Sequence, residues 1–306
     1  MSSMSELIGR TDLLQVKNSI PGLKLDKLLF AGKEPWRKTC GPTGLARNTM
    51  RPLDVRVHEL LLAGERSQIA LKNTDLSVGT RWAGSQKSPL YATFVGVAGQ
   101  SFGAFATEHI NLRLDGVAHE GVAKGQSGGT VIIIPPEDSW GDEAVLVGNG
   151  LRYGASGGNC FIAGKVGERA GVLQKSGVTV VHGAGWHYGE YMAGGTLVSL
   201  APVGRNAFAG MCGGVGFVYN TDKEDFRRSM AKGLKVEQIA ENSPFTAILL
   251  HVIEEHKAAT ESPLAVQRLE AMATGNFEGW WVITPDIKDP KQLEAKREAQ
   301  EEYARQ

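Results

Sequence analysis

The chain has 306 residues, of which 42% are hydrophobic and 22% charged, a composition typical of a protein that buries a core. Its 33 lysines and arginines balance 33 aspartates and glutamates, so no net positive field would attract nucleic acid or an anionic membrane surface. No apolar run approaches the ~20 residues of a membrane-spanning helix, and the first residues lack the apolar core of a secretory signal. The three cysteines, Cys40, Cys160 and Cys212, form neither a CxxC pair nor an even disulfide set. We therefore expect a reduced, cytoplasmic protein without a nucleic-acid or membrane partner.

Residues 1–90 are predicted to form an N-terminal arm and cap that lead into the main body. The expected elements are a short helix begun by residues 8–14 and capped by Thr11 or Asp12, an extended arm over residues 21–44, a helix over residues 54–63, and strands at residues 68–71 and 80–84. An extended arm needs a surface to lie against, which suggests the rest of this chain or a partner.

A glycine-rich repeat occupies residues 91–220. The stretch from Gly96 to Asn220 holds 28 of the chain's 39 glycines. One sequence pattern recurs in it: a glycine-bounded turn, a small or polar residue, a Gly-Gly pair and a short apolar run. Copies begin at Gly121, Gly150, Gly185 and Asn206. Such a repeat indicates one structural unit that is stacked many times.

Short strands with a period of two run through this repeat. They are predicted at residues 110–116, 130–134, 144–147, 178–181, 196–200 and 216–219. No stretch between residues 91 and 220 has helical spacing, which excludes parallel strands joined by helices. Short strands joined by glycine corners, recurring every ~20 residues, predict an all-β core in the form of a single-stranded solenoid, a parallel β-helix. Glycine supplies the positive φ of the corners and lets neighbouring coils approach closely.

Residues 221–306 are predicted to contain C-terminal capping helices and a charged tail. Helices are expected at residues 225–233, 236–241, 245–257 and 263–273, an extended apolar segment that packs back on the body at residues 277–285, and a solvated tail from residue 287. In the third helix, Ile248, Leu249, Val252 and Ile253 are expected to form the apolar face. Because the ends of a β-helix must be covered, these helices are natural caps.

The glycine-rich region does not match the known patterns for chemistry. The string from Gly158 to Lys165 has one residue too many for a phosphate loop and lacks its Ser/Thr, and no GxGxxG is present. The histidines and cysteines have no zinc-ligand spacing and are interpreted as surface or hydrogen-bonded histidines and small buried thiols. Ser127, Ser156 and Cys212 each precede Gly-Gly, a position that favours a small side chain in a tight coil over a nucleophile.

Charged and polar residues beside the glycine corners are the remaining candidates. They are interpreted as corner hydrogen-bonding and ion-pairing groups, with a partner-facing or tunnel-lining surface as the functional alternative. The candidate structural or partner-facing turn residues are Asn73, Asp75, Arg81, Glu168, Arg169, Glu190, Arg205 and Asn206, with Lys124 in a similar setting. No catalytic, cofactor-binding or metal-binding residue is assigned.

The repeat resembles the C-terminal GXGXG domain of the large (alpha) subunit of glutamate synthase. The matching segments are residues 97–105 (VAGQSFGAF), 125–129 (GQSGG), 153–158 (YGASGG), 164–169 (GKVGER), 190–195 (EYMAGG) and 204–214 (GRNAFAGMCGG), with residues 8–14 (IGRTDLL) and 71–81 (LKNTDLSVGTR) upstream and 250–256 (LHVIEEH) downstream. The likeness covers roughly residues 6–285. The C subunit of formylmethanofuran dehydrogenase has the same repeat, but the IGRTDLL arm favours glutamate synthase.

The resemblance implies a right-handed β-helix with a structural role. In that family the domain holds an N-terminal class II glutaminase against an FMN and iron–sulfur synthase barrel, and ammonia is channelled between them. This chain has no Cys after Met1, no cysteine cluster for iron–sulfur and no barrel. We therefore expect a stand-alone, non-catalytic scaffold subunit that has no cofactor of its own. Its expected partners are a glutaminase-like subunit and an FMN-binding, iron–sulfur synthase-like subunit.

Three alternatives remain open at this point. The chain could serve an N-methylglutamate synthase-like complex, a formylmethanofuran dehydrogenase-like complex, or act as an independent β-helix enzyme. The last would need two carboxylates facing each other across neighbouring coils, and no two acidic residues recur one coil apart on a strand face. Residues 38–51 and the charged tail do not match the family and are possible docking elements.

Overall fold

The computed structural model describes residues 10–15, 29, 68–85, 87–136 and 144–286. The chain divides into two compact units, residues 1–52 and 53–306. In the first unit, Thr11–Leu13 form a 3-10 helix, η2, whose N-terminal flanking residue is Arg10, with no side-chain cap. A short helix is therefore present in this arm, but the prediction that Thr11 or Asp12 caps it is wrong.

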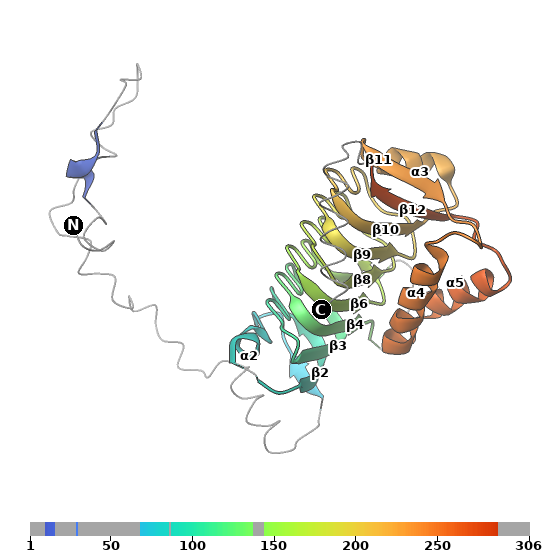
Figure 1. The fold of residues 1–306 in the computed structure, drawn as a ribbon. Coiled ribbons are helices and arrows are strands. Elements are labelled where there is room, and N and C mark those ends of the chain that lie inside the picture. The colour runs from blue at the N-terminus through green and yellow to red at the C-terminus, as the bar shows by residue number, and fades with distance from the viewer. Residues whose placement is uncertain (1–9, 16–28, 30–67, 86, 137–143, 287–306) are drawn as a thin grey trace. The chain divides into compact units, whose positions relative to one another are not determined.

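The second unit contains the solenoid and the elements that follow it (Figure 1). Its strands are β1 (Ile69–Leu71), β2 (Leu90–Ala98), β3 (Ile110–Ala118), β4 (Ser127–Ile134), β5 (Val145–Val147), β6 (Gly157–Ile162), β7 (Lys165–Val166), β8 (Val178–Val181), β9 (Ala193–Ser199), β10 (Gly213–Tyr219), β11 (Leu234–Gln238) and β12 (Trp280–Pro285). Its helices are α2 (Thr80–Ser85), α3 (Lys223–Ser229), α4 (Thr246–Thr260) and α5 (Pro263–Ala273).

Parallel strands stack one coil upon the next, which confirms the β-helix prediction. The main sheet runs in the order β1-β2-β3-β4-β6-β8-β9-β10, and each pairing in that series is parallel. Leu112 pairs with Val131, and Val131 pairs with Cys160 one coil further on. A second face is formed by β5 and β7, where Val147 pairs with Val166. Within the described parts of residues 91–220, no helix interrupts the coils.

The solenoid core follows from the period of two along each strand. In β3 the side chains alternate between buried and half-buried, and Ile110, Leu112 and Leu114 point inward with at most 1% exposure. The same positions of adjacent strands supply the matching layers of the core, because parallel pairing brings equivalent residues side by side.

A five-residue turn with three left-handed residues closes each coil. Its first, third and fifth residues all have positive φ, and its second residue points into the core. These turns, called the corner loops below, are residues 101–105, 121–125, 150–154, 169–173, 187–191 and 206–210. Glycine adopts this conformation at the least cost, which explains the glycine spacing of the repeat.

An antiparallel strand pair follows the last coil. β12 pairs antiparallel with β10, so that Tyr219 lies opposite Trp280, and β11 pairs antiparallel with β12. The rings of Phe226 and Trp281 stack with centroids 4.4 Å apart, and Trp281 Nε1 donates to the carbonyl of Asn220 at 2.9 Å. The extended segment predicted at residues 277–285 therefore packs back on the body, as expected.

The two long C-terminal helices lie along the side of the solenoid (Figure 1). Leu249 and Ile253 of α4 share an apolar cluster with Val180 and Val198, whose side chains point out of the coils. The expected helices at residues 245–257 and 263–273 are thus present as α4 and α5. They cover a lateral face of the strands, whereas capping helices over an open end were expected.

Several sequence-based expectations are corrected by the fold. Residues 80–84 form helix α2 and no strand, with Trp82 buried at the base of the coils. Residues 234–238 are strand β11, although residues 236–241 were expected to be helical, because the pairing with β12 overrides the local preference. Ile248 is 42% exposed and does not join the apolar face of α4. The helix expected at residues 54–63, most of the arm and the charged tail lie outside the described residues.

Candidate functional site

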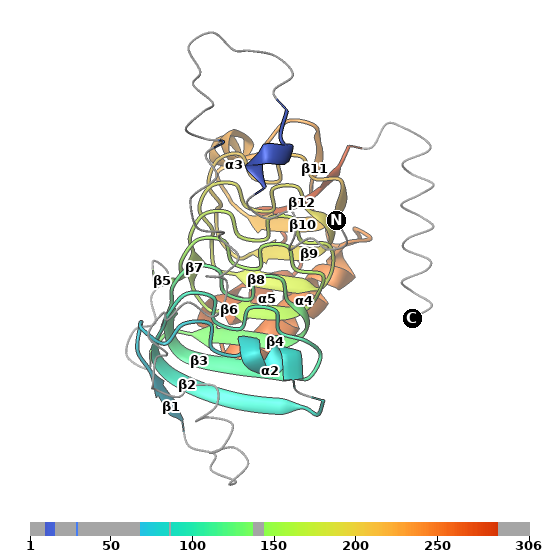
Figure 2. The ribbon, with the colours of Figure 1, turned by 90° about the vertical axis from the view of Figure 1, so that its left-hand side faces the viewer.

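The corner loops stack along one edge of the solenoid, on the side away from α4 and α5 (Figures 1 and 2). Backbone hydrogen bonds join each loop to the next. Arg169 N donates to the carbonyl of Trp186 at 2.8 Å, and His187 N donates to that of Arg205 at 2.9 Å. Glu168-Arg169, Trp186-His187 and Arg205-Asn206 therefore occupy equivalent positions on three consecutive coils. Of the candidate residues, Glu168, Arg169, Arg205 and Asn206 thus lie at turns of neighbouring coils.

Glu190 belongs to the same group, through His187. His187 Nδ1 lies 3.7 Å from Oε1 of Glu190 and 3.1 Å from Nδ2 of Asn206. Glu190 and His187 are half-buried, whereas Glu168, Arg169 and Arg205 are exposed. The half-buried pair satisfies corner polar groups, and the exposed charges are available at the surface.

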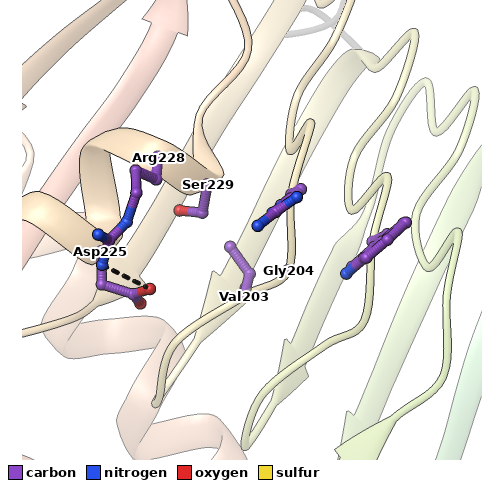
Figure 3. Close-up of a pocket in the computed structure, with 7 residues that line it drawn as sticks. Val203, Gly204, Asp225, Arg228 and Ser229 are labelled. Carbon is purple, nitrogen blue, oxygen red and sulfur yellow. Dashed lines mark ion pairs between the residues drawn. The ribbon is translucent and has the colours of Figure 1, made fainter.

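A pocket of about 370 Å³ opens beside this group, between the last corner loops and α3 (Figure 3). Trp186, Val203, Gly204, Arg205, Asp225, Arg228 and Ser229 line it. The Arg205 guanidinium lies 6.0 Å from the centre of the Trp186 ring, and Arg228 Nη2 lies 3.7 Å from Asp225 Oδ1. Two guanidinium groups and an exposed indole can receive a carboxylate or a planar group of a partner.

Sequence reasoning missed the α3 side of this pocket. Asp225 and Arg228 lie 20 or more residues beyond Arg205 in the chain, and only the docking of α3 against the last coil brings them near. Trp186 could have been noticed, because a large aromatic residue stands there at a corner position that a polar or charged residue fills in the other coils.

Asn73, Asp75 and Arg81 lie at the opposite end of the coil stack, so the structure does not join them to the other candidates. Asp75 Oδ2 accepts a hydrogen bond from Lys72 N at 2.8 Å, and the Asp75 carbonyl accepts one from Gly99 N at 3.2 Å. Asp75 thus holds the turn that precedes the first full coil, which supports the structural interpretation for it. Arg81 is exposed on α2.

A buried arginine inside the coils was also missed. Arg152 is fully buried, and its five N–H groups reach neutral acceptors only. The acceptors are Oε1 of Gln126, Oε1 of Gln174 and the carbonyls of Gly157, Gly158 and Ser176. Burial lowers the pKa of Arg152 to about 10. Gln126 and Gln174 occupy the same position of the repeat, and this polar pair at an otherwise apolar position was the available signal.

Two buried histidines meet between the solenoid and the helices. Nε2 of His182 lies 3.4 Å from Nε2 of His256 and 2.8 Å from Oγ of Ser262. Burial, and then the nearby Arg268, lower the pKa of His182 to about 4, and burial holds the pKa of His256 well below its usual range. Both rings are therefore neutral near pH 7. Among the residues that the structure describes, no three His, Cys, Asp or Glu side chains gather as a metal site.

This parallel β-helix with stacked glycine corners defines the class of protein. Residues 56–286 match the family model described as the GXGXG motif, and the chain belongs to that family. Among the proteins it resembles is the ferredoxin-dependent glutamate synthase of Pyropia yezoensis, which is 33% identical over 295 residues, with 91% of this chain and 19% of the relative covered.

Bacterial relatives show similar identity and similar coverage. The NADPH glutamate synthase large chains of Bacillus subtilis and Azospirillum brasilense are 33% and 35% identical, with 88% and 93% of this chain covered. The chain spans about a fifth of the length of the curated relatives it matches: 19% and 20% for these two. It corresponds to the C-terminal GXGXG domain of glutamate synthase large subunits.

Proposed function

We propose that this chain is a non-catalytic scaffold subunit of a glutamate synthase-type amidotransferase complex. It would dock a class II glutaminase-like subunit to an FMN- and iron–sulfur-containing synthase-like subunit and help to enclose the ammonia path between them. The single observation that carries this proposal is the match of nearly the whole chain to the C-terminal GXGXG domain of glutamate synthase large subunits. Under this proposal, the glutaminase and synthase parts of the enzyme are supplied by the partner subunits.

The geometry of the solenoid suits a scaffold. Parallel pairing and coil-to-coil hydrogen bonds run without interruption from β2 to β10, so the body is a stiff spacer. The exposed charges Glu168, Arg169 and Arg205 are held at fixed positions on it, as a docking surface requires. The pocket beside Arg205 offers cationic groups to an acidic residue of a partner.

Reconstitution tests the proposal directly. The full chain is purified alone and together with candidate glutaminase-like and FMN-binding synthase-like proteins from the same organism. Complex formation is measured by size-exclusion chromatography with light scattering. We expect a ternary complex that forms glutamate from glutamine and 2-oxoglutarate with a reductant, while this chain alone is inactive. The two partners without this chain serve as the control.

Two results would overturn the proposal. One is glutamate-forming activity of the chain alone, and the other is failure of both partner proteins to bind it. Supplying methylamine or ammonia to the reconstituted complex identifies the amine that it uses, which separates a glutamate synthase from an N-methylglutamate synthase. A cytoplasmic location is part of the proposal. Among the described residues, no helix is both long and apolar enough to cross a membrane.

A further inference from the structure

Large apolar side chains line the edge formed by the corner loops. Phe105, Leu173 and Tyr191 occupy the fifth position of their corner loops and are 54%, 39% and 58% exposed. Tyr153, at the fourth position of the loop between them, is 38% exposed. These four residues, called the edge stripe below, belong to corner loops that stack along the solenoid axis, and Figure 2 shows the side of the solenoid on which these loops lie.

The coil geometry does not require these residues. The fifth position has a left-handed backbone, with φ of +60° at Phe105, +57° at Leu173 and +53° at Tyr191. Bulky residues adopt this conformation only at a cost that glycine avoids. Glycine occupies the same position at Gly125, Gly154 and Gly210. A bulky apolar residue that is both strained and exposed therefore points to a role outside folding.

Glycines on the following coil make room for two of the aromatic rings. A Cβ at Gly125 would lie 2.7 Å from Cδ1 of Phe105, and one at Gly210 would lie 2.7 Å from Cδ1 of Tyr191. The aromatic rings thus lie along the axis, over the next coil. From the coil of Phe105 to that of Tyr191 there are four steps of ~4.8 Å, a length of roughly 19 Å.

Recognition at this edge must use side chains. The backbone N–H groups of Phe105, Leu173 and Tyr191 already donate to the carbonyls of Lys124, Glu190 and Ala209 in the next coil, at 2.7–2.9 Å. No row of free backbone groups is therefore left here for an added β-strand. A helix that lays apolar side chains along the stripe uses side-chain contacts alone. A helix of about 13 residues matches the stripe in length.

We infer that the edge stripe is the apolar centre of a docking surface for an amphipathic helix of a partner subunit. This inference rests on the proposed function. The opposite side of the coils is already covered by α4 and α5 of this chain, and four-fifths of each relative's length lies outside the matched region. Among the described residues, the stripe is an exposed apolar surface, and under the proposed function a partner subunit can pack against it.

The residue types around the stripe resemble those of a protein–protein interface. Lys124 lies 6.0 Å from the Tyr153 ring centre, and the half-buried Glu190 directly precedes Tyr191 in its corner loop. Exposed aromatic residues ringed by charges of both signs are typical of the centre and rim of a heteromeric contact. At their exposures, four such side chains offer a few hundred Å² of apolar surface, a substantial part of the ~800 Å² per partner in a standard interface.

The test replaces Phe105, Leu173 and Tyr191 with asparagine, which tolerates the left-handed conformation. The full-length triple variant and the wild type are titrated separately with the glutaminase-like and the synthase-like subunit by calorimetry. We expect at least a tenfold weaker Kd for one of the two subunits, with the Tm changed by no more than a few degrees. Tyr91→Thr and Val145→Thr, which remove exposed apolar groups from other faces, should leave the Kd unchanged.

Any other outcome rejects the docking surface, and one of them also rejects the proposed function. Equal binding of both subunits by wild type and triple variant rejects the docking surface and leaves the proposed function standing, whereas a wild type that binds neither subunit rejects both. A fall in Tm of more than about 10 °C shows that the stripe holds the coils together. A photo-crosslinker at position 191 that joins a second copy of the chain, or residues 16–67 of the same chain, identifies a different occupant and also rejects the inference.

Discussion

Nη1 of Arg152 donates a 2.6 Å hydrogen bond to Oε1 of Gln126 in the interior of the solenoid, where neither side chain is exposed. A buried guanidinium without a carboxylate partner is stable only when neutral oxygens occupy all of its donor directions. The coil geometry provides them, because Gln126 and Gln174 flank Arg152 from the coils on either side. This cluster ties three coils together.

Replacing Arg152 with methionine should destabilise the protein by about 3 kcal/mol or more, because Oε1 of Gln126 and several backbone carbonyls lose their buried donor. Arg169→Met is the matched control, since Arg169 has nearly the same positive φ one coil further on but is exposed. Urea unfolding measures both. Equal stability of the two variants would show that the buried network contributes nothing.

Gly195→Ala should be far more damaging than Gly154→Ala. Both glycines have positive φ, +77° and +69°. A Cβ at Gly195 would lie 2.5 Å from the carbonyl oxygen of Gly177 in the preceding coil, whereas at Gly154 no atom beyond its two chain neighbours lies within 4 Å. We expect a loss of about 1 kcal/mol at Gly154 from backbone strain, and roughly 3 kcal/mol or more at Gly195, where the coils must also separate. A similar Tm for both variants would contradict close coil contact.

The solenoid could be predicted from the repeat, because the glycine spacing and alternating strands such as residues 110–116 show where each coil turns. The gathering of Glu168, Arg169 and Arg205 was predictable for the same reason, since they share one phase of the repeat. The predictions that failed concern segments whose structure depends on contacts outside the repeat. Residues 80–84 and 236–241 are too short for periodicity to separate helix from strand. In β11, pairing with β12 makes the segment a strand. The placement of α3 and its Arg228 beside Arg205 has no local signal at all.

Cys160 and Cys212 should differ sharply in reactivity. The sequence predicts small buried thiols for both, but the structure buries Cys160 and exposes Cys212. Burial, partly offset by Arg152, raises the pKa of Cys160 to about 12, so its thiolate is scarce at pH 8. In a Cys40→Ser background, we expect one fast-reacting thiol with Ellman's reagent and a second that reacts only after unfolding. Loss of the fast phase in Cys212→Ser identifies it, and two fast thiols in the folded protein would contradict the assignment.

The buried pair His182 and His256 should make the junction between the solenoid and the helices sensitive to acid. Burial lowers both pKa values in the folded state, so the unfolded chain takes up protons first. The stability they support is therefore complete above about pH 6.5 and is lost as the pH falls toward 4. For His182 alone, the shift from 6.5 to about 4 corresponds to about 3 kcal/mol at the acid end.

A near-isosteric substitution isolates this effect. His256→Phe removes one titrating ring from the pair while filling its place beside Phe161. The urea midpoint of this variant should fall less between pH 7.5 and 5.0 than that of the wild type, because fewer buried groups must be protonated on unfolding. His251→Gln, a change of an exposed histidine on the same helix, should behave like the wild type. If His256→Phe loses as much stability as the wild type over this range, the acid sensitivity arises elsewhere in the chain.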